Sequence, residues 1–201
     1  MFVIGITGGT ASGKTTFVNS LKTIFNKDNL TILSQDNYYK SLKHLTIKER
    51  EKNNFDHPDS IDFSLLNEHL SLLKHNKTIE VPNYCFNTHG RLAKTTTIVP
   101  KKVIIIEGIL TLSQPEIKKA CDYTIFIDAN AKIRMQRRLK RDVEERSRTT
   151  ESVLMQFKTH ITPMHNTFVK PVKTNVDLVI DGTKSFQSNL DKISVLINKH
   201  L

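Results

Sequence analysis

The sequence predicts a three-layer α/β sandwich around a five-stranded parallel sheet, and two observations support this fold class. Short runs rich in Val and Ile, suited to strands buried on both faces, alternate with longer amphipathic segments. Right-handed crossovers between parallel strands then place helices on both faces of the sheet. The expected strands are 2–7, 30–34, 103–107, 124–128 and 176–180, and the expected helices are 13–26, 61–75, 130–146, 149–168 and 185–199.

The junction between the first strand and the first helix carries a phosphate-binding motif. It reads Gly8-Gly9-Thr10-Ala11-Ser12-Gly13-Lys14-Thr15-Thr16, which fits G-x-x-x-x-G-K-T. Gly8 and Gly13 allow backbone conformations that turn successive N–H groups toward phosphate oxygens. Lys14 is expected to reach the β- and γ-phosphates, and Thr15 to ligate the Mg²⁺ that bridges them. A plain glycine turn is the alternative, but the amphipathic helix that follows favours a P-loop NTPase fold.

Length and composition predict one domain over residues 1–201, which contains the P-loop. The chain has 38% hydrophobic residues, enough for a sizeable core, and its longest apolar runs are too short to span a bilayer. Its N-terminus offers no charged region with a cleavage site, so we expect a cytoplasmic protein without a membrane partner. The two cysteines, Cys85 and Cys121, lack metal-ligand spacing and are expected to be reduced thiols.

The net charge of +10 is unevenly distributed, because six of the eight arginines lie between positions 134 and 148. Arg134, Arg137, Arg138 and Arg141 share one face of the expected helix, and Met135, Leu139 and Val143 form a separate apolar stripe. Guanidinium groups bind phosphate oxygens bidentately. With a P-loop in the chain, an arginine lid over 132–160 that closes on the triphosphate is favoured over a solvated basic face or an RNA-binding helix.

Residues 78–100 interrupt the alternation of strands and helices. Two β-like runs, 79–81 and 95–99, flank a polar turn around His89-Gly90-Arg91, which predicts an inserted β-hairpin. Insertions at the carboxyl ends of strands are where such folds place substrate specificity.

Acidic residues follow three expected strands at the edge where ligands bind in open α/β sheets. Asp36 is the candidate general base, since a phosphoryl acceptor hydroxyl needs a positioned carboxylate. Glu107, with Asp36 and Thr15, is a candidate ligand of Mg²⁺, directly or through water. Asp128 is expected to cap the helix that starts near Ala131 rather than to act in the site.

Several blocks together make the sequence resemble the uridine kinase (uridine-cytidine kinase) family of P-loop nucleoside kinases. They are the P-loop 8–16, Ser34-Gln35-Asp36-Asn37-Tyr38-Tyr39, Asn54-Phe55-Asp56-His57-Pro58-Asp59, the hairpin segment 81–91, Glu107-Gly108-Ile109-Leu110, and Arg137-Arg138-Leu139-Lys140-Arg141-Asp142 followed by Glu145-Arg146-Ser147-Arg148. The resemblance covers most of the chain. The Phe-Asp-His-Pro-Asp block and the Tyr-x-Phe-x-x-His hairpin are much more specific than the P-loop.

The resemblance implies roles for individual residues. Asp36 matches the base for the ribose 5′-hydroxyl, and Asp56 matches the acceptor of hydrogen bonds from the ribose 2′- and 3′-hydroxyls. Further nucleoside contacts match Phe55, Tyr84, Phe86, His89, Arg138, Arg148 and Gln156. Phosphate-facing lid positions match Arg141 and Arg146, and Arg141 is assigned a catalytic role with Asp36 and Lys14. Arg137, on the arginine face of the lid helix, is also expected to bind the triphosphate. A homotetramer is also implied.

Three positions depart from the family pattern. Cys85 stands where the family has Asp, Ser147 stands where it has Gly, and Ile180-Asp181-Gly182-Thr183 replaces Ile-Pro-x-Gly in the loop expected to border adenine.

The predicted activity is transfer of a phosphoryl group from ATP (or GTP) with Mg²⁺ to the 5′-hydroxyl of uridine, and of cytidine, in pyrimidine salvage. The alternatives are a P-loop small-molecule kinase related to pantothenate kinase or phosphoribulokinase, or a basic P-loop module that binds RNA or switches on GTP. The sequence lacks an Asn-Lys-x-Asp guanine signature, and its arginines cluster as a lid, so a nucleoside rather than a nucleic acid is the expected partner.

Overall fold

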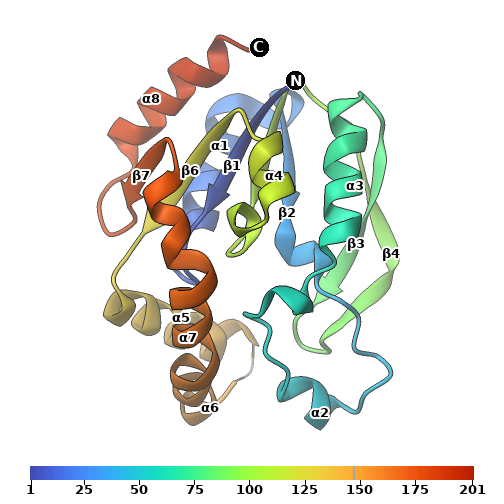
Figure 1. The fold of residues 1–201 in the computed structure, drawn as a ribbon, viewed down its shortest axis with the longest axis vertical. Helices are drawn as coiled ribbons and strands as arrows, with labels where there is room; N and C mark the ends of the chain where they lie inside the picture. The colour runs from blue at the N-terminus through green and yellow to red at the C-terminus, as the bar shows by residue number, and fades with distance from the viewer. Residues whose placement is uncertain (147) are drawn as a thin grey trace.

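The computed structural model describes residues 1–146 and 148–201, and its centre is a parallel sheet (Figure 1). Five strands form this sheet in the order β2-β5-β1-β6-β7. Their bounds are β1 Phe2–Thr7, β2 Leu30–Ser34, β5 Val103–Glu107, β6 Tyr123–Asp128 and β7 Leu178–Asp181. All pairings are parallel, so the carboxyl ends of the strands meet at one edge. The predicted fold class is confirmed.

Helices cover both faces of the sheet and complete the three layers (Figure 1). On one face, α1 (Lys14–Asn29) and α8 (Gln187–Asn198) pack a core that includes Phe17, Leu21 and Ile193. On the other face, α3 (Phe63–Lys74) and α4 (Pro115–Ala120) pack a second core that includes Leu66 and Ile117. Burial of these apolar faces at roughly 25 cal/mol per Å² is the main force that holds the helices to the sheet.

The inserted segment forms the expected antiparallel hairpin, with strands longer than predicted. They are β3 (Ile79–Cys85) and β4 (Gly90–Ile98), and the register shifts between Pro82 and Tyr84. Gly90 and Arg91 pair with Cys85 and Tyr84 inside the ladder, so the turn precedes them. The Arg91 guanidinium donates to the carbonyl of Tyr39 (3.0 Å) and to the Asp62 carboxylate (3.0 Å), which fixes the hairpin beside the carboxyl edge of the sheet.

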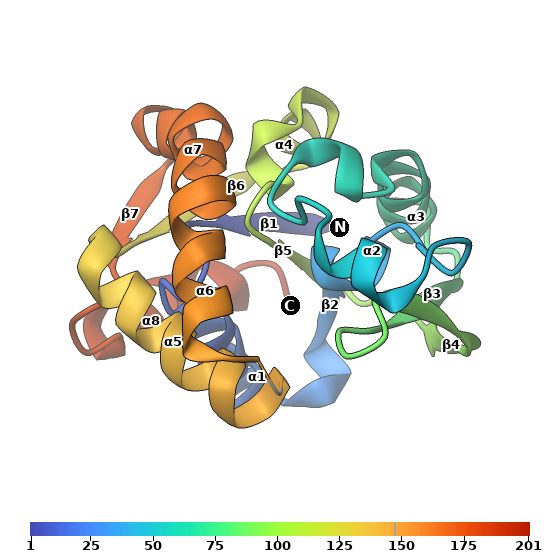
Figure 2. The ribbon, with the colours of Figure 1, turned by 90° about the horizontal axis from the view of Figure 1, so that it is seen from below.

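The lid consists of α5 (Ala131–Arg146) and α6 (Thr150–Gln156), which lie across the carboxyl edge on the side opposite α2 (Ile47–Glu51) (Figure 2). The chain continues after α6 through π-helical turns, Phe157–Ile161 and His165–Val169, on either side of α7 (Thr162–Met164), and then enters the 3₁₀ segment Lys170–Asn175. The prediction of one regular α-helix over 149–168 was therefore wrong, because the helical chain there contains two π-helical segments.

The buried face of α5 is not its apolar stripe. Val143 is 41% exposed, and Met135 and Leu139 are only partly buried. The buried residues of α5 are Arg134, Arg138 and Asp142. These charged groups can be buried because α5 packs against polar backbone groups and because its arginines pair with Asp142.

The expectation that Asp128 caps α5 was wrong. The Asn130 side chain accepts from the N–H of Ile133 (3.0 Å), whereas Asp128 receives a hydrogen bond from Lys173 (2.7 Å). Short elements that the sequence did not predict are α2, α4 and the 3₁₀ turns Gln35–Tyr38, Pro58–Ser60 and Thr111–Ser113. Among the described residues, no helix is both long and apolar enough to cross a membrane.

One buried hydrogen bond supports the turn that follows β2. The Tyr38 hydroxyl and His69 Nδ1 lie 2.7 Å apart, and burial lowers the pKa of His69. We expect Tyr38→Phe to lower the free energy of unfolding by about 1–2 kcal/mol, because the imidazole nitrogen loses its partner in a buried place. Urea denaturation measures this change, with Tyr123→Phe as the control at a partly exposed tyrosine. Equal stability of the two variants would contradict the prediction.

Candidate functional site

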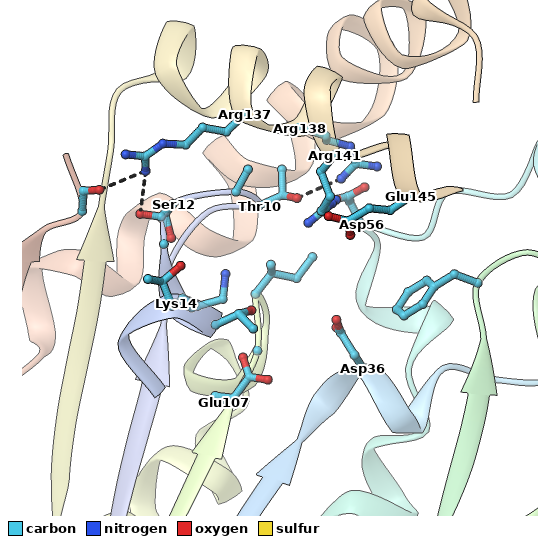
Figure 3. A pocket seen from close by; sticks show the side chains of 18 of the residues that line it. Thr10, Ser12, Lys14, Asp36, Asp56, Glu107, Arg137, Arg138, Arg141 and Glu145 are labelled. Atoms are coloured by element: carbon cyan, nitrogen blue, oxygen red, sulfur yellow. Dashed lines mark hydrogen bonds between the residues drawn. The ribbon is translucent and has the colours of Figure 1, made fainter. Parts of the chain in front are cut away.

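A cavity of about 840 Å³ opens at the carboxyl edge of the sheet, between the P-loop, the hairpin and the lid. This volume is typical of a small-molecule site. Figure 3 shows Lys14, Glu107 and Asp36 on the strand side of the cavity, with arginines of α5 opposite them. The cavity therefore joins the phosphate-binding motif to the segments in which substrate specificity was expected.

The P-loop presents the amino end of α1 to the cavity. Gly8 and Gly13 have φ of 149° and 109°, which side chains with a Cβ resist, and Ala11 is also left-handed at 57°. No side chain caps α1, and its first turn contains no acid. Its first N–H groups are thus free to bind an anion. The Lys14 ammonium donates to the carbonyls of Gly8 (2.9 Å) and Gly9 (3.1 Å) beside this helix end.

Oxygen-bearing side chains gather near Lys14: the carboxylates of Asp36 and Glu107 and the hydroxyls of Ser34 and Thr15. Glu107 ends β5 and accepts from the Ser34 hydroxyl (2.5 Å), and Asp36 lies in the 3₁₀ turn after β2. Burial and the neighbouring Asp36 charge raise the pKa of Glu107. Burial lowers the pKa of Lys14 to about 8, although Glu107 and Asp36 oppose this shift. With Thr15, these groups form an oxygen-only set that fits Mg²⁺.

The lid arginines pack against the P-loop from the opposite side. Arg138 donates to the Thr10 hydroxyl (2.9 Å), and Arg137 donates to the carbonyls of Gly182 (2.9 Å) and Ser12 (3.4 Å). These bonds tie α5 to the phosphate loop and to the end of β7 (Figure 3). Arg141, Arg146 and Arg148 also line the cavity.

Aromatic side chains form the hairpin half of the cavity. Phe55 stacks on His89 with ring centroids 4.4 Å apart, and Tyr39 lies against Tyr84 at 5.1 Å. The Arg146 guanidinium lies 4.0 Å from the centre of the Phe86 ring. His89 has a left-handed backbone (φ 48°), which is uncommon for a residue with a Cβ. These rings supply flat apolar walls of the kind that hold a planar heterocycle.

Polar groups within this aromatic half have no partner among the described residues. The Tyr84 hydroxyl and His89 Nδ1 are buried without a hydrogen bond. Burial and the charges of Arg148 and Arg50 lower the pKa of His89 to about 4, so its imidazole is neutral at neutral pH. Asp56 is 9% exposed, and burial raises the pKa of its carboxyl despite the nearby Arg138 charge. Unpaired buried polar atoms in a cavity favour a ligand that supplies the missing hydrogen bonds.

Most of the predicted site residues gather around this cavity. Those that line it are Thr10, Ala11, Ser12, Gly13, Lys14, Thr15, Thr16, Asp36, Phe55, Asp56, Tyr84, Phe86, His89, Glu107, Arg137, Arg138, Arg141, Arg146 and Arg148. Gly8 and Gly9 do not line the cavity, but their carbonyls accept from Lys14. Gln156 does not line the cavity; its side chain accepts from Arg148 (2.6 Å). The roles of these residues remain predictions, and Ser147 lies outside the described residues.

Sequence reasoning assigned no role to several residues that line the cavity. They are Tyr39, Gly108, Ile109, Glu145 and the segment 184–186; Gly182 and Thr183, which also line the cavity, belong to the loop expected to border adenine. Within the segment 184–186, Phe186 packs edge-on against Phe17 at 5.3 Å, close to the P-loop. The rule that ligands lie beyond the carboxyl ends of parallel strands would have found the segment 184–186, since it lies just beyond the end of β7.

The chain is similar to known kinases in both sequence and fold. The family model described as "Phosphoribulokinase / Uridine kinase family" matches residues 3–187. A protein named uridine kinase from Alkaliphilus metalliredigens is 44% identical over 98% of this chain and 96% of its own length. One of the same name from Clostridium perfringens is 43% identical over 88% of this chain and 85% of its own length. The structure of D-glycerate 3-kinase from Cryptococcus neoformans shares the fold, with a TM-score of 0.63 and 15% identity over 92% of this chain and 87% of that one.

The buried ammonium predicts a pH dependence of nucleotide binding. The pKa of Lys14 is lowered to about 8, so the free protein loses this positive charge as the pH rises through that value. We expect the Kd of Mg-ATP to rise above about pH 8, by up to about tenfold per pH unit. Calorimetric titration from about pH 7 to pH 9.5 measures it, with AMP, which lacks β- and γ-phosphates, as the control. An ATP affinity that does not change over this range would refute the prediction.

Proposed function

The chain belongs to the phosphoribulokinase/uridine kinase family, and from this we propose that it phosphorylates uridine, and also cytidine, with ATP in pyrimidine salvage. The observation that carries the proposal is one cavity that joins a P-loop to an aromatic half with unpaired polar atoms. The names of relatives at 41–44% identity over most of the chain support the same acceptor.

The donor half is proposed to bind Mg-ATP. The uncapped end of α1 and Lys14 suit the β- and γ-phosphates, and Arg141 and Arg146 suit the charge that develops on the transferred group. Thr15, Asp36 and Glu107 would hold Mg²⁺, directly or through water. When bound, the ion neutralises negative charge between the phosphates. We propose ATP as the donor, with GTP as the alternative.

The acceptor half is proposed to bind the nucleoside. Asp56, buried beside Arg138, offers two oxygens to the vicinal ribose hydroxyls. Tyr84 and the neutral His89 would pair with the edge of the pyrimidine, and Phe55 and Phe86 would contact its faces. Arg138 and Arg148 would orient the sugar and base from the lid side.

Asp36 is proposed as the general base. Its carboxylate lies between the P-loop side and the aromatic side of the cavity, where the 5′-hydroxyl would meet the γ-phosphate (Figure 3). The ribose oxygen forms a bond to the γ-phosphorus while the bond to the β,γ-bridging oxygen breaks. The hydroxyl proton passes to Asp36, ADP leaves, and the nucleoside 5′-monophosphate is the product.

Ligand-induced stabilisation separates this proposal from the alternatives. A ligand that binds only the folded state raises the melting temperature by mass action. We expect uridine and cytidine to do so in the presence of Mg-ADP, and pantothenate, ribulose 5-phosphate and a short RNA to have no effect. Stabilisation by one of the latter three instead would replace the proposed acceptor.

We also propose a cytoplasmic homotetramer, as the sequence resemblance implies. Light scattering coupled to size-exclusion chromatography measures the assembly directly, and a monomeric mass would exclude it.

The base assignment predicts the effect of Asp36→Asn. The amide keeps the size of the side chain but is not a base, so kcat with uridine should fall on the order of 100-fold or more. Uridine affinity, measured by calorimetry, should stay within about threefold. Asp191→Asn, on the exposed surface of α8, is the matched control. Near-normal turnover in Asp36→Asn would remove Asp36 from the reaction.

The hairpin turn generates a second prediction. Hydrogen bonds from Thr88 lower the pKa of the Cys85 thiol, which is partly exposed, so a carboxylate placed there would have donors. We expect Cys85→Asp to raise kcat/KM for uridine about tenfold, because a carboxylate accepts stronger hydrogen bonds and fixes the turn before His89. Steady-state kinetics and melting temperature measure the change, with Cys85→Ser as control. Loss of both activity and stability would show that the turn is adapted to the thiol.

A further inference from the structure

Asp142 lies at the centre of an arginine cluster formed by Arg138, Arg141, Arg146 and Arg148. Its side chain is fully buried. The carboxylate lies 2.8 Å from Arg141, 3.2 Å from Arg138, 3.5 Å from Arg148 and 3.8 Å from Arg146, measured to the nearest guanidinium nitrogen of each ion pair. Four cations therefore share one anion.

The carboxylate is ionised in this environment. Burial raises its pKa, but the arginines outweigh burial, and the pKa of Asp142 is lowered. Arg141 binds one oxygen through both Nε (2.9 Å) and Nη2 (2.8 Å), a geometry that sets the plane of the guanidinium. The side-chain orientation of the arginines thus depends on the charge of one residue.

Asp142 also lies where the two lid helices meet. The N–H of Arg148 donates to the Asp142 carbonyl (3.1 Å), and the Arg148 side chain continues to Gln156 on α6 (2.6 Å). Asp142 therefore contacts Arg148, which precedes α6, through both backbone and side chain, and Arg148 in turn contacts the last residue of α6.

The four arginines face both halves of the cavity. Arg138 donates to Thr10 of the P-loop, and the Arg141 charge acts on Lys14. On the other side, Arg146 lies on Phe86, and the Arg148 charge acts on His89. A single buried carboxylate contacts the guanidinium groups of the donor side and of the acceptor side.

We propose that Asp142 is a positioning residue, which holds the lid arginines in the orientation that the phosphates of the donor and the acceptor nucleoside require. The proposal rests on the proposed function for the identity of the acceptor. Arginine side chains that are already ordered in the free protein do not lose conformational entropy when the substrates bind. Asp142 therefore improves donor binding and turnover without touching either substrate.

Asp142→Asn tests the proposal, because it keeps the shape of the side chain and removes its charge. We expect the Kd of Mg-AMPPNP to weaken about tenfold, and kcat with uridine per binding site to fall at least tenfold. Removal of a negative charge beside the phosphates would by itself tighten binding. A weakened Kd therefore reports lost positioning. Reduced stability alone lowers the number of binding sites and leaves the Kd unchanged.

Glu144→Gln is the matched control, since it removes the same charge from an exposed position of the same helix. A Kd for Mg-AMPPNP in Asp142→Asn that is tighter than, or within twofold of, the control would overturn the proposal.

If Asp142→Asn does not fold, Asp142→Glu is measured in its place, because it keeps the charge but displaces it by one methylene. At least threefold weakening is then expected, and a wild-type Kd would overturn the proposal. A wild-type protein that binds Mg-AMPPNP but does not phosphorylate uridine would refute the proposed acceptor only. The role of Asp142 is still tested in that case, because it is measured by the Kd of Mg-AMPPNP.

Discussion

The site depends on a balance of charge in which positive groups exceed the carboxylates that neutralise them. Arg138, Arg141, Arg146 and Arg148 share Asp142, and their mutual repulsion is only partly offset. Burial lowers the pKa of Lys14, and the Arg141 charge acts in the same direction, against Glu107 and Asp36. A polyanion such as a triphosphate completes the balance, so the energy of arranging these cations is recovered when the donor binds.

The parts of the fold that depend on local sequence could be predicted. Short β-branched runs such as 103–107 favour buried strands, and the P-loop motif fixes its own backbone through Gly8 and Gly13. The buried face of α5 could not be predicted, because hydrophobicity favoured Met135, Leu139 and Val143 as the inner stripe. The helix instead packs on the hydroxyl of Thr10 and on backbone carbonyls, partners that lie far away in the sequence.

The sequence predicted which residues form the acceptor half but not the shape of the pocket, because that shape depends on long-range contacts. Tyr39 joins the aromatic walls because Arg91 in β4 binds its carbonyl. Arg50 donates to the carbonyls of Thr88 (2.7 Å) and Lys43 (2.9 Å), so the turn before His89 is fixed from the α2 segment. Neither arginine carries a local pattern that would indicate this role. The left-handed backbone of His89 is likewise a property of the folded turn, not of the residue type.

The contact between Arg146 and Phe86 joins the lid to the hairpin beside the cavity. A cation over an aromatic ring is worth about 0.5–2 kcal/mol, so this contact on its own would be broken in roughly one molecule in 3 to 30. An interaction this weak does not by itself hold the lid against the hairpin.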